Sequence, residues 1–237
     1  MERKTGDLLV NWSIPPTPKN LNFNGLHVSL SPISLKKHAL QLYNQYKKDG
    51  DGIIWDYMGV GPFESFSQFE EWVKSIESKD DPYFLAITKN EDNIPYGLAS
   101  YMRIKPQDSC IEVGNISYSL PLQSTTHATE AMCLMMNWAF ENGYRRYEWK
   151  CNSLNKKSRK AAQRLGFNFE GVFHKHMIVK GRNRDTAWFS ITDNNWPELK
   201  KCFDKYLNPE NFDLNKVQKI SLSSLTKKFI TNKDPTL

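Results

Sequence analysis

Several common sequence signatures are missing from this chain of 237 residues. It has no run of about 20 apolar residues, the length that a membrane-spanning helix needs. The segment from Met1 to Asp7 is charged and leads into no apolar signal region, so we expect neither secretion nor membrane insertion. The cysteines form no C-x-x-C pair, which favours reduced thiols in a cytoplasmic protein, with the nucleus possible, over a disulfide framework or zinc site. They are Cys110, Cys133, Cys151 and Cys202.

Motifs of several enzyme classes are also missing. The chain contains no Walker phosphate loop, no nucleophile elbow and no group of His, Cys, Asp and Glu with the spacing of metal ligands. We therefore expect no metal and no covalent enzyme intermediate. Hydrophobic residues make up 39% of the chain and aromatic residues 13%, which is enough for a folded core and too much for a disordered chain.

The net charge of +6 is unevenly distributed. Residues 145–185 contain twelve Lys and Arg against three acidic residues, whereas residues 51–81 contain eight acidic residues against two Lys. A basic half that faces an acidic segment is typical of a protein that holds a small anion beside a cationic partner. Two solvated faces of opposite sign are the alternative interpretation.

Hydrophobic periodicity and turn residues predict the order of the secondary-structure elements. Strands are expected at residues 26–30, 83–87, 96–104, 111–120, 147–151, 172–179 and 186–191. Helices are expected at residues 35–48, 67–78, 129–141, 155–165 and 196–206, with Ser34 as the N-cap of the first. This order predicts an α/β fold with a mixed sheet, in which an antiparallel meander is followed by a splayed parallel strand pair joined by a crossover helix.

The chain divides into three predicted regions. Residues 1–25 are irregular and rich in Pro and Asn, so we expect an N-terminal arm on the surface. Residues 26–206 contain all the predicted strands and the main helices, and form the domain. Residues 207–237 are polar and rich in Lys, and are expected to form a tail or a docking helix.

One polar loop gives the strongest indication of a ligand-binding site. It follows the strand at 111–120 and precedes the helix at 129–141, whose N-terminus offers unpaired N–H groups and the positive end of the helix dipole. Pro121 cannot donate to a sheet ladder, so the strand must end or splay there. The resulting slot would let an extended amide ligand use free backbone groups as a missing strand would.

This segment, from Ile116 to Ala131, resembles motif A, Q/R-x-x-G-x-G/A, of the GNAT superfamily of acetyl-CoA-dependent N-acetyltransferases. The resemblance continues through Asn155-Lys156-Lys157-Ser158 and Leu165-Gly166-Phe167, which match N-x-x-S and L-G-F. It covers residues 26–195, and the spacing is similar to the branch that includes ribosomal-protein N-terminal acetyltransferases. It implies transfer of acetyl from acetyl-CoA to a primary amine, on a small molecule or a peptide N-terminus.

The resemblance also implies roles for particular residues. The CoA pyrophosphate would be wrapped by backbone N–H groups of Gln123, Ser124, Thr125, Thr126, His127 and Ala128. The acetyl-pantetheine would meet the backbone of Leu120 and Leu122 and the side chain of Asn155, and Ser158 would lie near the thiol. Four basic side chains would lie near the nucleotide phosphates or form a solvated helix face: Lys156, Lys157, Arg159 and Lys160.

Two residues depart from the family pattern. Thr126 stands where the first motif glycine is expected, so the phosphate cradle must be wider or the Thr hydroxyl must itself bind a phosphate. Ala162 stands where many family members have a general-acid Tyr, so another group or water must protonate the leaving thiolate.

Candidate catalytic residues follow from the reaction. An alkyl amine has a pKa near 10, so a base must take its proton directly or through water. Glu112, near the start of the splaying strand, is the first candidate base, and His174 and His176 are the alternatives. Tyr118 and Ser158 are the candidates to protonate the thiolate. Each of these side chains also has a plain structural interpretation as core, surface or cap.

The expected partners are therefore acetyl-CoA and an amine acceptor, with no nucleic acid and no membrane, in a monomer or homodimer. The acidic segment at 51–81 favours a cationic amine, which Trp55 or Tyr57 could stack on. A non-catalytic CoA-binding or interaction protein on the same fold is the alternative function. A nucleic-acid binder is less well supported, because the basic region coincides with the expected CoA site.

Overall fold

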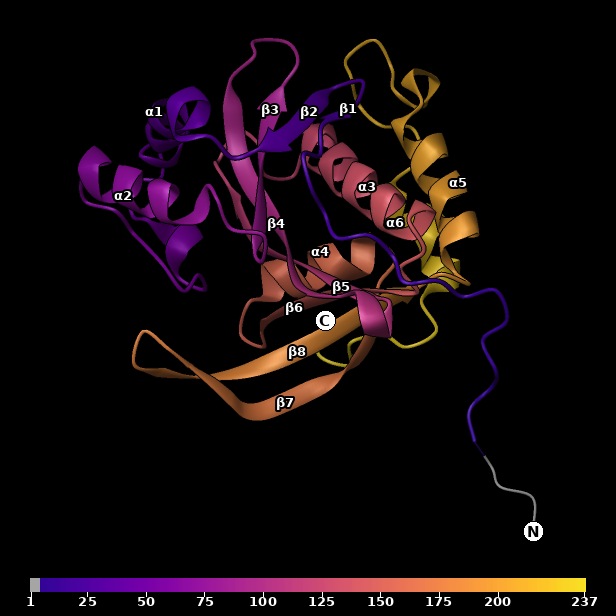
Figure 1. Cartoon of the computed structure of the whole chain (residues 1–237). Coiled ribbons are helices and arrows are strands. Elements are labelled where there is room, and N and C mark those ends of the chain that lie inside the picture. Colours follow the sequence, from indigo (N-terminus) through magenta and orange to yellow (C-terminus); the bar gives the residue numbers. More distant parts are fainter. Residues whose placement is uncertain (1–4) are drawn as a thin grey trace.

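The computed structural model describes residues 5–237 and places eight strands of this range in one sheet (Figure 1). The strands are β1 (Phe23–Asn24), β2 (Val28–Pro32), β3 (Tyr83–Lys89), β4 (Pro95–Lys105), β5 (Cys110–Tyr118), β6 (Arg146–Asn152), β7 (Asn168–Val179) and β8 (Arg182–Thr192). The helices are α1 (Leu35–Tyr46), α2 (Phe66–Ile76), α3 (Thr126–Glu141), α4 (Lys156–Arg164), α5 (Trp196–Leu207) and the short α6 (Leu222–Thr226), and a single-turn helix, η1 (Ile53–Trp55), follows α1.

The sheet order is β1-β2-β3-β4-β5-β6-β8-β7. Only β5 and β6 are parallel, with α3 as their crossover, and the other neighbouring strands are antiparallel. The mixed α/β sheet predicted from the sequence is therefore confirmed, including the meander before the parallel pair. The two-residue strand β1 was not predicted, because so short a segment has no periodicity.

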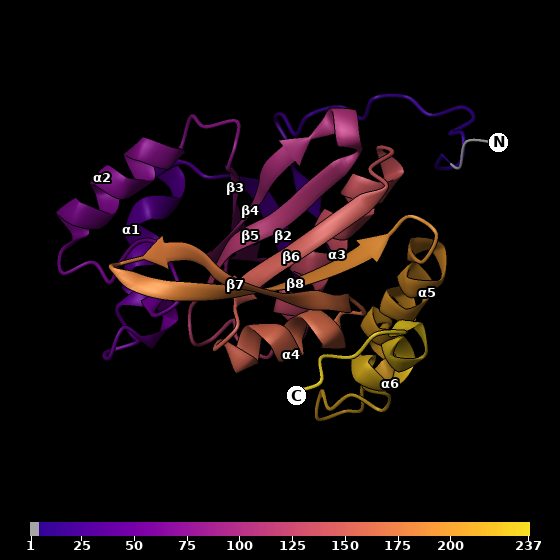
Figure 2. The same cartoon turned by 90° about the horizontal axis from the view of Figure 1, so that it is seen from below.

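Two hydrophobic clusters hold the helices on opposite faces of the sheet (Figure 2). The larger one packs α3, α4 and α5 against one face, and Tyr101, Tyr147 and Phe189 are fully buried in it. The smaller one packs α1 and α2 against β3 and β4 on the other face, around Phe69 and Leu98. The sheet is thus covered by helices on both faces, but by different helices over different strands.

The N-cap of α1 is the predicted one, whereas the N-cap of α3 changes the predicted start of that helix. The Ser34 side chain accepts a hydrogen bond from the Lys37 N–H and starts α1, as predicted. Helix α3 starts at Thr126, three residues before the predicted start, because the Thr125 hydroxyl accepts from the Ala128 N–H at 3.2 Å. His127 and Ala128, expected in the loop, therefore lie in the first turn of the helix.

Both terminal regions are fastened to the domain. In the arm, the Trp12 indole donates to the Ser109 hydroxyl at 2.5 Å and the carbonyl of Pro16 accepts from the Tyr144 hydroxyl at 3.0 Å. In the C-terminal region, Leu222 of α6 is buried in the larger hydrophobic cluster. No helix among residues 5–237 is long and apolar enough to cross a membrane.

The C-terminal region also corrects one expectation about phosphate binding. Arg159 does not lie on a solvated helix face: it is buried, and its guanidinium donates to the Asp234 carboxylate at 2.6 Å and to the Ser153 carbonyl at 2.8 Å. A guanidinium that is buried in this ion pair is not available to a nucleotide. Lys156, Lys157 and Lys160 on the same helix are exposed.

Candidate active site at the divergence of β5 and β6

The two parallel strands pair for only half of their length. Their register runs from Cys110–Arg146 to Val113–Trp149, after which β5 continues to Tyr118 and β6 to Asn152 with no further pairing between them among the described residues. The edge of β5 after Val113 therefore keeps backbone groups that face no partner strand. We call the point after Val113–Trp149 the divergence.

A β-bulge in β5 marks the divergence. Asn115 has a φ of +50°, and the register with β4 shifts beside it. The bulge is held by Ser100, whose hydroxyl donates to the Gly114 carbonyl at 3.1 Å and accepts from the Asn115 amide at 3.0 Å. The sequence analysis missed this bulge, although a Gly-Asn pair inside a strand is a typical signal for one.

The bulge decides which side chains face which side of the sheet. Before it, Glu112 pairs with Met102 and lies on the face of α1 and α2, while its neighbours Ile111 and Val113 pack in the α3 cluster. After it, Ile116 and Tyr118 pack against the α3 cluster instead. Without the extra residue, Tyr118 and Glu112 would lie on the same face. The candidate base and the candidate acid are therefore on opposite faces.

On the α3 face, residues 119–125 form a tight loop. The Ser119 N–H and hydroxyl both donate to the Tyr96 carbonyl, at 3.0 and 2.6 Å. The N–H groups of Leu122 and Gln123 donate back to the Ser119 carbonyl, and the Gln123 side chain donates to the Tyr118 carbonyl at 2.9 Å. The backbone of Leu122, expected to meet the pantetheine, is already used within the loop: its N–H donates to Ser119 and its carbonyl accepts from the Thr125 hydroxyl. The Leu122 side chain is buried in the core, whereas Leu120 is exposed.

The end of this loop presents free donors. The backbone N–H groups of Ser124, Thr125, Thr126 and His127 have no acceptor among the described residues. They lie at the N-terminus of a 16-residue helix, where the dipole also favours an anion. The left-handed φ of +59° at Ser124 turns the chain into this position. His127 lies beside the Glu91 carboxylate, with burial as the main cause of its lowered pKa.

Asn155 and Ser158 have structural contacts at the start of α4. The Asn155 Oδ1 accepts from the Ser158 N–H at 3.0 Å and caps the helix, which leaves its Nδ2 without a partner in residues 5–237. The Ser158 hydroxyl accepts from the Trp149 indole at 3.0 Å, and Trp149 is the last residue of β6 that pairs with β5. Both residues therefore lie at the divergence, and each keeps one hydrogen-bonding group for another molecule.

Tyr118 lies on the same face as α3 and α4. Its hydroxyl is buried and has no hydrogen-bond partner among the described residues. Burial raises the pKa of this phenol above its usual value, so it stays neutral and remains a donor. Tyr118 is the last residue of β5, beyond the divergence. A buried hydroxyl without a partner costs free energy, so this hydroxyl favours a polar group of a ligand as its partner.

On the opposite face, a chain of charged side chains crosses the sheet. The Glu112 Oε2 is 2.7 Å from Arg103 Nη1 and 2.9 Å from Lys150 Nζ. Lys150 also contacts Glu148 at 2.5 Å, and Arg146 joins Glu148 to Glu170. Glu112 and Lys150 are almost fully buried, and the Lys150 ammonium lies 3.9 Å from the centre of the Trp188 ring.

The two carboxylate oxygens of Glu112 have different surroundings. Both cations bind Oε2, while Oε1 has no hydrogen-bond partner among residues 5–237. Oε1 lies next to Gly114, because a β-carbon there would be 3.5 Å from it. Gly114 is the first residue after the last β5–β6 pair, so Oε1 is at the divergence. The sequence found Glu112 but not Lys150 and Arg103, whose pairing depends on sheet register.

The two candidate histidines are further away. His174 and His176 lie on β7, which is separated from β5 by β6 and β8. His174 is exposed beside Asp185, and the His176 Nδ1 is 3.0 Å from the Thr186 hydroxyl. The structure thus brings Glu112, but not these histidines, next to Gly114 at the divergence.

The acidic segment contains both core and surface residues. Trp55 is buried with Phe63, Phe69 and Trp72 in an aromatic cluster and also lines a hollow beside it, so its stacking on a substrate cation stays a prediction. Tyr57 is exposed. A hollow beside the cluster is lined by Asp49, Asp51 and Glu64 and by Tyr46, among others. The Tyr46 hydroxyl in turn contacts Ser117, beyond the divergence.

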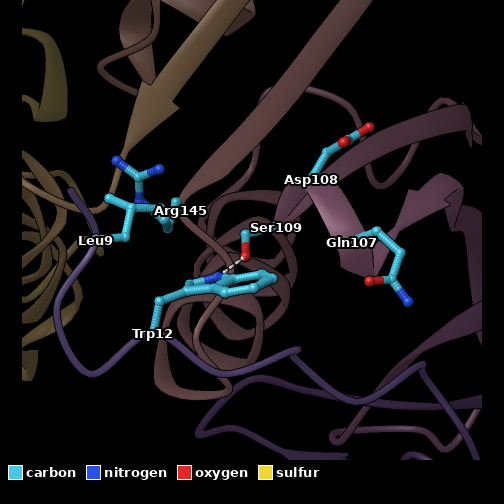
Figure 3. A pocket seen from close by; sticks show the side chains of 6 residues that line it. All are labelled: Leu9, Trp12, Gln107, Asp108, Ser109 and Arg145. Carbon is cyan, nitrogen blue, oxygen red and sulfur yellow. Dashed lines mark hydrogen bonds between the residues drawn. The ribbon is translucent and has the colours of Figure 1, made fainter. Parts of the chain in front are cut away.

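A second hollow lies at the other end of the strands. Figure 3 shows it between the N-terminal arm and the segments that precede β5 and β6, and it is lined by Leu9, Trp12, Gln107, Asp108, Ser109 and Arg145. Because β5 and β6 are still paired at this end, the hollow is remote from the divergence. Residues 5–237 bring together no three His, Cys, Asp or Glu side chains that could hold a metal ion.

The comparisons with known proteins agree with this geometry. The acetyltransferase (GNAT) domain family matches residues 27–168. A GCN5-related N-acetyltransferase from Brucella melitensis is 39% identical with a TM-score of 0.89, over 92% of this chain and 99% of that one. A probable GNAT acetyltransferase from Chromobacterium violaceum is 34% identical with a TM-score of 0.77, over 82% and 98%. No curated protein matches the chain.

A more distant structure shares the fold alone. The microcin C7 self-immunity acetyltransferase, solved in complex with acetyl-CoA and AMP, is 22% identical with a TM-score of 0.63, over 71% of this chain and 93% of that one. The chain belongs to the GNAT acetyltransferase family, and it is an acetyltransferase.

Proposed function

We propose that the protein transfers acetyl from acetyl-CoA to the nitrogen of a primary amine. The divergence of β5 and β6 carries this proposal, because it has free anion-binding N–H groups on one face and the unpaired Glu112 Oε1 on the other. A ligand bound from the α3 face and an amine bound from the α1 face would meet there. The protein would work without a metal and in the cytoplasm, where free cysteines stay reduced.

The residues present fit acetyl-CoA. The N–H groups of residues 124–127 suit a pyrophosphate, and the exposed Lys156, Lys157 and Lys160 suit the other phosphates of the nucleotide. The free edge of β5 and the Asn155 Nδ2 suit the amides of the pantetheine. Thr126 narrows the cradle relative to glycine, although its own hydroxyl is a further donor.

The reaction needs one proton acceptor and one proton donor. Glu112 Oε1 would take a proton from the ammonium through water, and the neutral amine would then attack the thioester carbonyl. The carbon–sulfur bond breaks as the carbon–nitrogen bond is completed, and the thiolate leaves. Tyr118 or Ser158, on the other face, would protonate the thiolate. The second proton that the nitrogen loses would return through water to Tyr118 or Ser158, which restores its hydroxyl. No covalent enzyme intermediate is needed, and the proton gained by Glu112 returns to solvent.

A second candidate function is a CoA-binding protein without catalysis. Two observations favour it: the β-branched Thr126 in the phosphate cradle, and the fully buried Ala162 at the position of the missing Tyr. The position of Glu112 favours the enzyme, because Arg103 and Lys150 hold its Oε2 while its Oε1 has no partner among residues 5–237. The likeness to the branch of ribosomal-protein N-terminal acetyltransferases supports a peptide N-terminus as the acceptor. A small amine is the other proposed acceptor.

One experiment separates these functions. Acetyl-CoA should raise the melting temperature of the protein, because a ligand that binds only the folded state stabilises it. Thiol release from acetyl-CoA should then increase when a panel of amines is added. Stabilisation without amine-dependent thiol release would identify the non-catalytic binder, and no stabilisation would refute both functions.

A further inference from the structure

One row of side chains on β8 lies on the α1 face of the sheet, the face of Glu112. Trp188 pairs with Lys150 of β6, so these two side chains lie on the same face. Thr186 and Arg184 follow at alternate positions of β8 and continue the row, and the Arg184 Nε donates to the Thr186 hydroxyl at 3.2 Å. Because Lys150 contacts Glu112 at 2.9 Å, one end of the row lies beside the candidate base.

The Arg184 guanidinium has no carboxylate partner among residues 5–237. Its side-chain hydrogen bond to Thr186 uses Nε and leaves Nη1 and Nη2 without acceptors in the described part of the chain. The side chain is half-buried, and burial is the main cause of its lowered pKa. The charges of Glu112 and Arg103 also raise and lower this pKa, respectively, so both groups lie near Arg184. Since a guanidinium stays charged in proteins, Arg184 is a half-buried cation without an ion pair.

The chain of charges from Arg103 to Glu170 does not neutralise this cation. It consists of three cations and three carboxylates that contact one another in alternation, so it is already balanced. Arg184 adds one positive charge to the same face and pairs with none of these carboxylates. A charge that leaves bulk water without a partner costs free energy, so Arg184 favours an anionic group from another molecule.

A second donor in the same row has no partner. The Trp188 Nε1 atom is buried and forms no hydrogen bond within residues 5–237. An indole N–H can only donate, so its partner must be an acceptor. The Trp188 ring is held between the Lys150 ammonium, at 3.9 Å, and the Phe173 ring, at 4.6 Å between ring centres. The buried N–H and the free guanidinium of this row both suit an oxygen that carries negative charge.

We infer that the acceptor is a primary amine that also carries an anionic oxygen group, a carboxylate or a phosphate, which Arg184 and Trp188 bind. This inference rests on the proposed function and narrows its acceptor. The amine would lie at Glu112 and the anionic group along the row toward Arg184, whose two free nitrogens suit the paired oxygens of such a group. The acidic residues at 51–81 fit the same acceptor, because they attract its ammonium.

The test compares anionic amines with neutral counterparts of similar shape. Glycine, β-alanine and γ-aminobutyrate are each paired with the corresponding primary amide, O-phosphoethanolamine with ethanolamine, and a tetrapeptide that begins with Asp with one that begins with Asn. These pairs distinguish a free amino acid, a phosphate and an acidic peptide as the source of the anionic group. Rates are referred to the neutral fraction of each amine, because the amine pKa differs within a pair. In the wild type, the best anionic amine should exceed its neutral counterpart by at least about tenfold in kcat/KM.

Variants of the row locate the anionic group. Arg184→Gln should lower the preference for the anionic amine at least about fivefold, mainly through a higher KM for that amine, and Arg184→Lys should restore part of it. Trp188→Phe keeps a ring beside Lys150 and removes the N–H, and should lower the preference about threefold. Arg182→Gln is the matched control and should leave the preference unchanged, because Arg182 is an exposed cation on the same strand.

The outcomes distinguish the inference from the proposed function. Equal kcat/KM for the anionic amines and their neutral counterparts in the wild type would overturn the inference while leaving acetyl transfer intact. An unchanged preference in Arg184→Gln, or an equal loss in Arg182→Gln, would overturn the assignment of the anionic group to this row. No thiol release with any amine, in protein that binds acetyl-CoA, would overturn the proposed function and the inference with it.

Discussion

The two faces of β5 use different chemistry for their two expected substrates. The α3 face offers backbone N–H groups, a helix dipole and single hydroxyls, and the buried ion pair Arg159–Asp234 fastens the C-terminal region. The α1 face carries a chain of buried charges from Arg103 to Glu170. Backbone donors can bind an anion without a counter-charge to displace, whereas a buried carboxylate needs its cations to be held in the fold.

The difference suggests how each face tolerates substitution. On the α3 face, most side chains can change as long as the loop keeps its shape. On the α1 face, a change at one charge alters its partners, because Lys150 is shared between Glu112 and Glu148. Variants on the two faces should therefore separate binding of acetyl-CoA from activation of the amine.

The largest effect is expected on the α1 face. Glu112→Gln keeps the shape and removes the base, and should lower kcat/KM for the amine by about 100-fold at neutral pH. The loss should diminish as pH rises toward the amine pKa, because more amine is then already neutral. The measurement is the pH profile of amine-dependent thiol release.

Glu148→Gln is the control for this variant. It removes a charge from the same chain, next to Lys150, but away from Gly114. Both variants should lower the melting temperature, and only Glu112→Gln should change the pH profile. If Glu148→Gln gives the same kinetic defect, the charge chain as a whole, and not a base at Glu112, explains the loss.

On the α3 face, Thr126→Glu should weaken acetyl-CoA binding by about 30-fold or more. A carboxylate among the free N–H groups repels the pyrophosphate, at a cost of roughly 2 kcal/mol. The same carboxylate favours the helix dipole, so the ligand-free melting temperature should stay equal or rise slightly. Calorimetric titration checks the affinity, with Thr126→Gln as the neutral control. Unchanged affinity would rule out this placement of the pyrophosphate.

A pair of variants at Asn155 separates helix capping from ligand binding, and we expect kcat/KM to fall about tenfold. Asn155→Ala loses the cap and the free amide, whereas Asn155→Asp keeps the cap and replaces the amide donor with a charged carboxylate oxygen. Both should lower kcat/KM about tenfold through one lost hydrogen bond of about 1.4 kcal/mol. Only Asn155→Ala should lower the melting temperature. Wild-type kinetics in Asn155→Asp would mean that Asn155 acts only as a cap.

The sequence could predict the α3 face better than the α1 face, because local patterns specify the former and strand register specifies the latter. Elements with strong periodicity were found in order, and the loop before α3 was found because strand end, polar run and helix start are local signals. The contacts of Glu112 were not found, because Arg103 and Lys150 reach it only through the registers of β4 and β6. Asp234 likewise is 75 residues from Arg159, and no local pattern connects them.

The smallest expected effect concerns capture of the amine. Asp51 and Glu64 are exposed and line the same hollow as Tyr46, whose hydroxyl contacts Ser117 of β5 beyond the divergence. Their negative charges should attract a cationic amine. Asp51→Asn/Glu64→Gln should raise the KM of the amine about threefold at low ionic strength, and 0.5 M salt should remove the difference because it screens exposed charges.

Asp56→Asn is the matched control for this capture, because Asp56 is an exposed acid of the same segment that does not line the hollow. It should leave the KM of the amine unchanged, and all these variants should leave the KM of acetyl-CoA unchanged. An equal rise in KM for the double variant and for Asp56→Asn would mean that only the net charge of residues 51–81 attracts the amine. An amine KM that is indifferent to salt and to every variant would leave the α1 face with a role in chemistry but none in substrate capture.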